Sequence, residues 1–455
     1  MILIRIEIAT NSSTKPDSVK YVFKAYICNN ITQTPIKMVL EIRLSNFFSV
    51  NEEVVLDLRA GNINTARSKS LSDNVFAYGT TDVLKTVALY GANASGKSNI
   101  IKTIRFCNAM IYESHKHNED VVFNFKPFRF DGYVKKPSTY FIRFVVNEVE
   151  YKYSFTLNQQ QILKESLYYY PNGRKAKVFE RDETIGKTKR EKYSFGNSVI
   201  KRPFDVAENT SNKTLYISRA SQMDRDIPKS IFNFFYRHFI LHHSNYGVRR
   251  LQPLIEDYKD QLLDALKFAD SDIIDFKVNF KKEKGRRMNV NLDTEEAFFD
   301  DDELERVEIK TYHKFSPKTA FNFNEESLGT QKLFIMMLTI IDIVRNNKTL
   351  LIDELEDSLH PKIVDYIIEI FNASNKAQLI FSTHNTNLLD LNKFRKDQIW
   401  FLNKKDDGGS DLYSLYDYSD FRDTMDLEKA YLQGRFDSIP IVNDSIENLH
   451  SIIKA

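Results

Sequence analysis

Alternation of apolar and polar residues with a period of two dominates two stretches of the chain. The first covers Met38–Leu44 and is followed by a short apolar run at Val54–Leu58. The second is divided by turn residues at Asn147-Glu148 and at Pro171-Asn172-Gly173. Because successive side chains of a strand point to opposite faces, both stretches predict antiparallel strands. The runs of the second stretch are Tyr140–Val146, Glu150–Leu157, Gln161–Tyr170 and Lys177–Glu180.

Apolar residues at helical spacing predict a helical insertion over residues 225–269. Ile231, Phe234 and Phe235 fall on one face of this insertion. Heptads are not sustained, so the pattern does not predict a long coiled coil. Residues 61–82 are rich in Asn, Ser, Thr and Gly and predict a loop.

Strand patterns return at Ile273–Phe280 and at Leu304–Thr311, with dense charge between them. The basic run Lys281–Arg287 is followed by an acidic stretch at residues 295–305. We interpret this region as a solvated hairpin of mixed charge. The alternative interpretation is that the basic run contacts nucleic-acid phosphates.

Three continuous apolar runs predict buried strands. They are Thr86–Tyr90, Thr349–Ile352 and Gln378–Phe381. Strands buried on both faces are typical of parallel sheets covered by helices. The chain is therefore expected to have an α/β fold, a mixed sheet flanked by helices, with an antiparallel β subdomain and a helical insertion.

The stretch from Gly91 to Ser98 has the spacing of a phosphate-binding loop. It follows one predicted buried strand and precedes a helical pattern, which is the context that this motif requires. Glycines let backbone N–H groups turn toward phosphates, and the helix N-terminus adds partial positive charge. Lys97 is expected to reach the β- and γ-phosphates, and the Ser98 hydroxyl to bind Mg²⁺. The predicted nucleotide-binding residues here are Gly91, Ala92, Asn93, Ala94, Ser95, Gly96, Lys97, Ser98 and Asn99.

Polar residues follow the other two buried strands directly. Asp353 and Glu354 follow the first, and His384 follows the second. The carboxyl edge of a parallel sheet is where ligands bind. We expect Asp353 to hold Mg²⁺ through its waters, Glu354 to polarise the attacking water, and His384 to donate to the γ-phosphate.

Ser327 and Gly329 stand at the start of a long apolar helix pattern, Leu333–Val344. A serine and a glycine at a helix N-terminus have the shape of the signature segment of ABC-type ATPases. Alone, this pattern is also that of a plain helix cap.

The phosphate loop, the signature segment, the Asp-Glu strand and the strand-end histidine occur in this order. Together they resemble the ABC-type ATPases of the SMC, DNA-repair and OLD groups, and more closely the RloA/AbiL-like AAA15 ATPases of bacteria. That family has ABC-type heads rather than hexameric rings. The resemblance runs from Met38 onward, through Leu351–Pro361 and Ser382–Asn385, to Tyr431–Phe436.

The resemblance implies a P-loop NTPase fold of ABC type and a composite ATP·Mg²⁺ site in a dimer. The phosphate loop, Asp353, Glu354 and His384 would come from one chain, and Ser327 and Gly329 from the other. The segment reads Ser-Leu-Gly-Thr-Gln instead of Leu-Ser-Gly-Gly-Gln. A glutamine for a Mg²⁺-sensing loop after the first helix is not evident.

Composition and charge bear on the partners and on the compartment expected for this protein. A formal net charge of +2 over 455 residues gives no bulk argument for a nucleic-acid partner. Two cysteines far apart, Cys28 and Cys107, fit a reducing, cytoplasmic compartment, and no apolar run has the length of a membrane span. Met38 is interpreted as the natural start, and an extra N-terminal hairpin is the alternative.

The expected division has four parts: an extension at 1–37, the first part of the ATPase head at 38–130, the β meander and helical insertion at 131–320, and the second part of the head at 321–455. After His384 the sequence has no Toprim-like acidic cluster and no His-based nuclease motif. The resemblance therefore implies a separate effector protein.

These patterns predict an ATP hydrolase that controls a partner effector, and the resemblance implies a role in anti-phage defence. The alternative is an SMC-like, nucleotide-gated DNA-binding ATPase of repair or replication. A transporter subunit is disfavoured by the β insertion after the phosphate loop.

Overall fold

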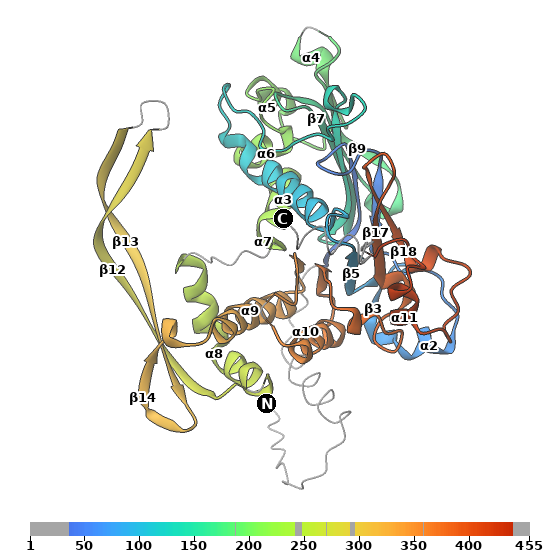
Figure 1. Ribbon diagram of the computed structural model, residues 1–455. Helices are drawn as coiled ribbons and strands as arrows, with labels where there is room; N and C mark the ends of the chain where they lie inside the picture. The colour runs from blue at the N-terminus through green and yellow to red at the C-terminus, as the bar shows by residue number, and fades with distance from the viewer. Residues whose placement is uncertain are drawn as a thin grey trace, which may run out of the picture.

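The computed structural model describes residues 36–186, 188–241, 248–269, 271–291, 296–357 and 359–439. The predictions for the extension at 1–37 lie almost wholly outside these residues, as does Cys28. Two large sheets and a projecting arm dominate the described part of the chain (Figure 1).

The first sheet is mostly parallel and carries the predicted buried strands. Its order is β11-β15-β16-β5-β17-β18, and only the β17–β18 pair is antiparallel. Parallel neighbours bring the carboxyl ends of β15, β16 and β5 to one edge. The bounds are β5 Thr86–Gly91, β11 Phe239–Leu241, β15 Thr349–Ile352, β16 Gln378–Ser382, β17 Ile399–Lys404 and β18 Ser410–Ser414.

Helices cover both faces of this sheet, as the continuous apolar runs predict. Val87 and Leu89 of β5 belong to one core with helix α3 (Lys97–Glu113). Ala88 and Tyr90 belong to a second core with α8 (Val248–Phe268), α9 (Leu328–Arg345) and α10 (Pro361–Ala373). The mixed α/β fold of a P-loop NTPase is thereby confirmed.

The second sheet is antiparallel, with the order β10-β9-β8-β7-β6-β1-β2. The predicted pairing of the two N-terminal strands is confirmed, and β1 also pairs with β6 of the meander. The sheet therefore runs across the expected boundary at residue 131. The bounds are β1 Lys37–Ser45, β2 Val54–Asp57, β6 Ser138–Val146, β7 Val149–Leu157, β8 Ile162–Tyr169, β9 Ala176–Asp182 and β10 Tyr193–Phe195.

Two predictions of local structure are wrong. Residues 61–82 form α2 (Ala66–Ser70), β3 (Val75–Tyr78) and the start of β4 (Thr81–Leu84), where a loop was expected. The helical insertion is interrupted by β11 between α7 (Asp226–Arg237) and α8. Because β11 has only three residues, its sequence is too short to show the alternation of apolar and polar residues typical of a strand. Its parallel pairing with β15 identifies it as a strand. The other α-helices of the described residues are α4 Lys189–Lys192, α5 Pro203–Glu208, α6 Tyr216–Gln222 and α11 Leu427–Leu432.

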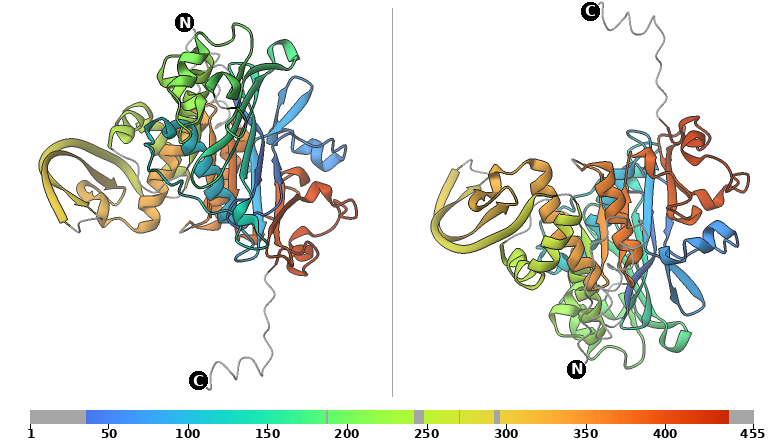
Figure 2. Two further views of the ribbon diagram at one scale, coloured as in Figure 1. Left: turned by 90° about the horizontal axis from the view of Figure 1, so that it is seen from above. Right: turned by 90° about the horizontal axis from the view of Figure 1, so that it is seen from below.

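The predicted charged hairpin is confirmed and is longer than expected. Strands β12 (Ile273–Asn291) and β13 (Glu296–His313), with β14 (Ser316–Asn322), form an arm that projects from the body. Both views of Figure 2 place this arm on one side and the β17–β18 hairpin with α2 on the other. In the strand register, Lys282 lies opposite Glu305 and Lys284 opposite Glu303, which favours the mixed-charge interpretation.

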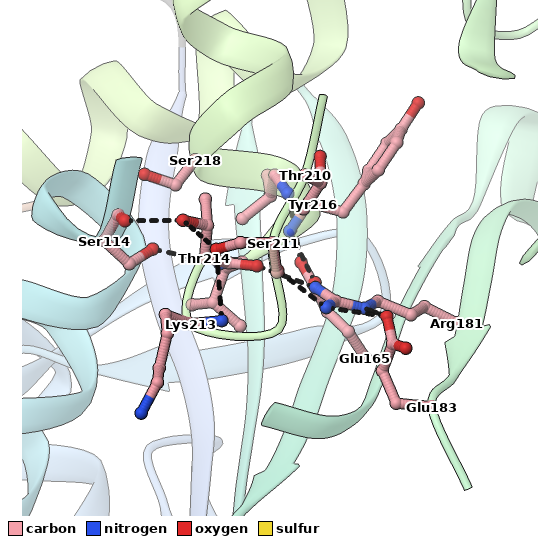
Figure 3. Close-up of polar contacts among 12 residues, drawn as sticks. Ser114, Glu165, Arg181, Glu183, Thr210, Ser211, Lys213, Thr214, Tyr216 and Ser218 are labelled. Atoms are coloured by element: carbon pink, nitrogen blue, oxygen red, sulfur yellow. Dashed lines mark hydrogen bonds and ion pairs between the residues drawn. The ribbon is translucent and has the colours of Figure 1, made fainter. Parts of the chain in front are cut away.

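A buried polar network joins the antiparallel sheet to α6 and to the end of α3 (Figure 3). Arg181 of β9 is buried with Glu165 of β8, at 3.6 Å, and its guanidinium donates to the carbonyl oxygen of Thr214 at 2.7 Å. Glu165 accepts from the backbone N–H of Tyr216 at 2.6 Å, which places a carboxylate at the start of α6. The Thr214 hydroxyl donates to the carbonyl oxygen of Ser114 at 2.9 Å.

His238, at the end of α7, makes the stability of this fold sensitive to acid. Burial is the main cause that lowers the pKa of His238 to about 3, and Lys37, Lys348 and Arg237 lower it further. The Lys37 ammonium donates to His238 Nε2. Since the folded pKa is below the unfolded value, this contribution to stability is present above about pH 6.5 and decreases as the pH falls.

We expect the free energy of unfolding to fall by about 2 kcal/mol between pH 7 and pH 5 through His238 alone. Urea unfolding at both pH values measures this change. His238→Gln removes the titrating group and should show a correspondingly smaller loss. Equal losses in the wild type and in the variant would contradict the assignment.

Candidate nucleotide site

The predicted phosphate loop connects β5 directly to α3. Its last glycine, Gly96, has a φ of 113° and forms the N-cap of α3, a left-handed conformation that favours glycine. Gly91 is equally constrained, because a Cβ atom there would lie 2.7 Å from the carbonyl oxygen of Leu402. The two glycines are thus required by the backbone path of the loop.

Lys97 lies inside this loop. Its ammonium donates to the carbonyl oxygens of Gly91 at 2.6 Å and Ala92 at 3.2 Å. Burial lowers the pKa of Lys97 to about 8, although Glu354, Asp353 and Glu356 oppose the shift. The Lys97 ammonium therefore lies in the loop that binds phosphate in this motif. The carboxylates of the loop after β15 act on it electrostatically.

Asp353 and Glu354 follow β15 at the carboxyl edge of the sheet. One hydroxyl positions both residues, because Ser382 at the end of β16 donates to Asp353 Oδ1 at 2.6 Å and accepts from the Glu354 backbone N–H at 2.7 Å. Glu354 has a φ of 52°, which is uncommon for a residue other than glycine. Its side chain is exposed. The paired carboxylates are thus displayed at the edge where ligands bind.

His384 lies at the same edge, directly after β16 and Thr383, and its side chain is exposed. Its backbone N–H donates to Glu356 Oε1. Glu356 was not predicted as a site residue, although it stands two residues after Glu354. This contact with His384, together with its effect on the pKa of Lys97, places Glu356 among the carboxylates of the site.

The predicted signature segment begins α9. Ser327 is the N-cap, and its hydroxyl accepts from the Thr330 backbone N–H at 3.1 Å. Leu328, between Ser327 and Gly329, is 75% exposed. In the described part of the chain, no hydrogen bond joins Ser327 or Gly329 to the phosphate loop of the same molecule.

A cleft of about 660 Å³ separates the first turns of α9 from the end of β15. Leu328 and Gln331 line it on the side of α9, Asp353 and Glu354 on the opposite side, and Arg105 of α3 completes it. The first turn of α9 and the pair Asp353 and Glu354 therefore line the same cleft. The Lys97 ammonium instead lies within the phosphate loop.

The oxygen donors present fit Mg²⁺. Asp353 uses one carboxylate oxygen for Ser382, and Ser98 lies half-buried in the first turn of α3. Within the described ranges, no group of three or more His, Cys, Asp or Glu residues could hold a metal ion. Mg²⁺ in nucleotide sites needs only one or two protein oxygens, because waters and phosphates supply the others.

Ser49 and Ser410 support the phosphate loop through hydrogen bonds. Sequence patterns did not predict these contacts. The Ser410 hydroxyl is 2.6 Å from the carbonyl oxygen of Ser95 and 2.8 Å from the Ser49 hydroxyl. Asn99 donates to the Ser49 hydroxyl at 2.9 Å. Ser410 belongs to the β17–β18 hairpin, and only the fold brings this hairpin against the loop.

Gly96→Ala is expected to weaken ATP binding by about 10-fold or more, because a left-handed alanine is strained. In addition, its Cβ atom would lie 2.2 Å from the Ser410 hydroxyl oxygen. Fluorescent-nucleotide titration measures this change. The matched control is Gly79→Ala, which also has positive φ but no atom within 4 Å of the added Cβ. Equal affinities for the two variants would contradict the prediction.

The family model described as "AAA domain, putative AbiEii toxin, Type IV TA system" matches residues 87–390. The chain belongs to this family. The match begins in β5 and extends past His384, so this AAA-domain chain holds every predicted site residue inside the matched region.

Solved SMC head domains are also similar to this AAA-domain chain. The head from Thermotoga maritima is 14% identical, with 83% of this chain and 98% of that chain covered and a TM-score of 0.36. The head with a coiled coil and joint from Pyrococcus yayanosii is 11% identical, with 88% and 99% covered and a TM-score of 0.39. These scores are low, and the fold assignment rests on the strand order above. No curated protein matches the sequence.

Among the described residues, no helix has the length and apolar character of a membrane span. Cys107 is a free, buried cysteine of α3.

Proposed function

We propose that this AAA-domain protein binds and hydrolyses ATP with Mg²⁺ at composite sites of a dimer. The observation that carries the proposal is that the phosphate loop with its buried Lys97 and the pair Asp353 and Glu354 follow parallel strands of one sheet and so lie at the same edge. Lys97 would bind the β- and γ-phosphates, Ser98 and Asp353 would hold Mg²⁺, Glu354 would polarise water, and His384 would donate to the γ-phosphate.

The second chain would supply Ser327 and Gly329. The support for this part is the position of the signature turn, which caps α9 and leaves Leu328 largely exposed. Backbone N–H groups at the start of α9 would then face the γ-phosphate of the partner.

We further propose membership of the RloA/AbiL-like AAA15 group, a cytoplasmic location, and control of a separate effector in anti-phage defence. The motif order from the phosphate loop to His384 supports the group membership, and the effector and the defence role follow from that resemblance. The SMC-like DNA-binding alternative has less support, because the register places Lys282 and Lys284 of β12 opposite Glu305 and Glu303 of β13.

Lys97→Ala tests the proposal. We expect ATP affinity to fall by about 10-fold or more, because charge-assisted hydrogen bonds to phosphate are lost. Calorimetric titration measures the affinity, and native mass spectrometry with and without ATP measures dimer formation. Lys102→Ala, on the exposed face of α3, is the control. Full ATP binding by Lys97→Ala would refute the assignment.

A further inference from the structure

The β12–β14 arm is the large element that the proposed function leaves without a role. It projects from the body, and β14 leads through the short 3₁₀ turn Phe323–Glu325 into the signature segment (Figure 1). Only Glu326 separates this turn from Ser327, the N-cap of α9. The arm and the signature turn are therefore adjacent in the chain, and the contacts of Glu326 decide how firmly they are joined.

The side chain of Glu326 binds the arm. Its Oε1 atom accepts from the Thr311 hydroxyl and lies 2.8 Å from Nε2 of His313, and both partners belong to β13. Thr311 is fully buried, and the Glu326 side chain is only 9% exposed. A buried carboxylate that loses its hydrogen-bond donors is costly, so this contact is expected to persist.

The backbone of Glu326 binds the signature turn. Its carbonyl oxygen accepts from Gln331 Nε2 at 2.8 Å, and the Gln331 backbone N–H donates to the carbonyl oxygen of Ser327 at 2.9 Å. Gln331 also lines the cleft that contains Glu354. One residue therefore links β13, through its side chain, to the first turn of α9, through its carbonyl group.

Aromatic packing makes the base of the arm rigid. Phe276 of β12 is buried against Phe334 of α9, with ring centroids 4.9 Å apart, and Phe323 packs on the same ring at 5.1 Å. Packed rings at these distances do not slide past one another freely. A displacement of the arm would therefore be transmitted to the start of α9.

We propose that Glu326 is a positioning residue that holds the Ser327 turn in register with the β12–β14 arm, so that the arm controls ATP turnover in the partner's site. The inference rests on the proposed composite site. Glu326 itself has no place at the phosphate loop. Its removal should leave nucleotide binding to the phosphate loop intact and lower turnover.

The first test compares Glu326→Ala with Glu326→Gln. For the alanine variant we expect an unchanged ATP dissociation constant for the isolated chain and a loss of kcat of about 10-fold or more. Gln retains an acceptor for Thr311 and should stay within about 3-fold of wild type. Glu325→Ala, which removes only the exposed capping contact to Asn322, is the matched control and should be neutral. Wild-type kcat in Glu326→Ala would overturn the inference.

Mixing variants tests whether Glu326 acts through the signature turn. Glu326→Ala keeps its phosphate loop and Lys97→Ala keeps its signature turn, so a mixed dimer contains one intact composite site. Recovered turnover in this mixture, but not in either variant alone, supports the inference. Recovery with Ser327→Ala plus Lys97→Ala, but not with Glu326→Ala plus Lys97→Ala, overturns it while the composite site stands. Failure of both mixtures overturns the composite site itself.

Thr311→Val provides an independent variant in case Glu326→Ala does not fold. It removes only the hydroxyl that donates to Glu326 Oε1 from the side of the arm. We expect the same result as for Glu326→Ala, namely unchanged ATP binding and reduced kcat. Wild-type kcat in a folded Thr311→Val would overturn the role of the contact.

Discussion

Glu354→Gln is expected to reduce ATP hydrolysis by about 100-fold to 10,000-fold, the range for loss of a general base. The substitution keeps the shape of the side chain and removes its ability to accept a proton. The backbone of Glu354 is held in its left-handed conformation by the Ser382 hydroxyl, so the amide should occupy the same place. ATP binding is expected to remain, and the variant should accumulate as an ATP-bound dimer.

A phosphate-release assay measures the loss of hydrolysis. Native mass spectrometry with and without ATP measures the accumulation of the dimer. Glu369→Gln, on the exposed face of α10, is the control for loss of one negative charge. Normal turnover by Glu354→Gln would show that another group activates the water, and Glu356 would be the next candidate because it accepts from the His384 backbone N–H. A dimer that forms equally without ATP would contradict the composite site.

Arg181→Met is expected to destabilise the protein by about 3–5 kcal/mol, the cost of breaking a buried ion pair from one side. The guanidinium is fully buried between Glu165 and Glu183, and it donates to the carbonyl oxygens of Ser211 and Thr214. Methionine fills much of the volume but leaves both carboxylates and both carbonyl oxygens without this donor.

Equilibrium urea unfolding followed by circular dichroism measures the loss. Lys177→Met on the same strand removes a partly exposed ion pair with Glu180 and should cost less than about 1 kcal/mol. Arg181→Met with Glu165→Gln removes the charges of Arg181 and Glu165, keeps an acceptor for the Tyr216 N–H, and should recover part of the loss, because no unpaired Glu165 charge remains. A change below 1 kcal/mol in Arg181→Met would contradict a structural role for the network.

Several features of this protein were determined by the sequence alone because they depend on short segments. The phosphate loop needs glycines at Gly91 and Gly96, and its strand and helix contexts follow from local apolar patterns. The strands of the meander follow from alternation, and a run that ends in Asp353-Glu354 predicts a buried strand with carboxylates at its edge. The site roles of these residues stay predictions until the variants are measured.

Only the tertiary structure decided which segments become neighbours. The pairing of β1 with β6 joins residues about 100 positions apart, and the Ser49–Ser410 contact joins residues 361 positions apart. Periodicity shows which side of a strand is buried, but it does not show which strand or hydroxyl lies beside it. For the same reason Glu356, the Glu165–Arg181 pair and the Glu326 link to β13 were beyond local patterns. Their chemistry depends on hydrogen bonds that form only after distant elements have packed together.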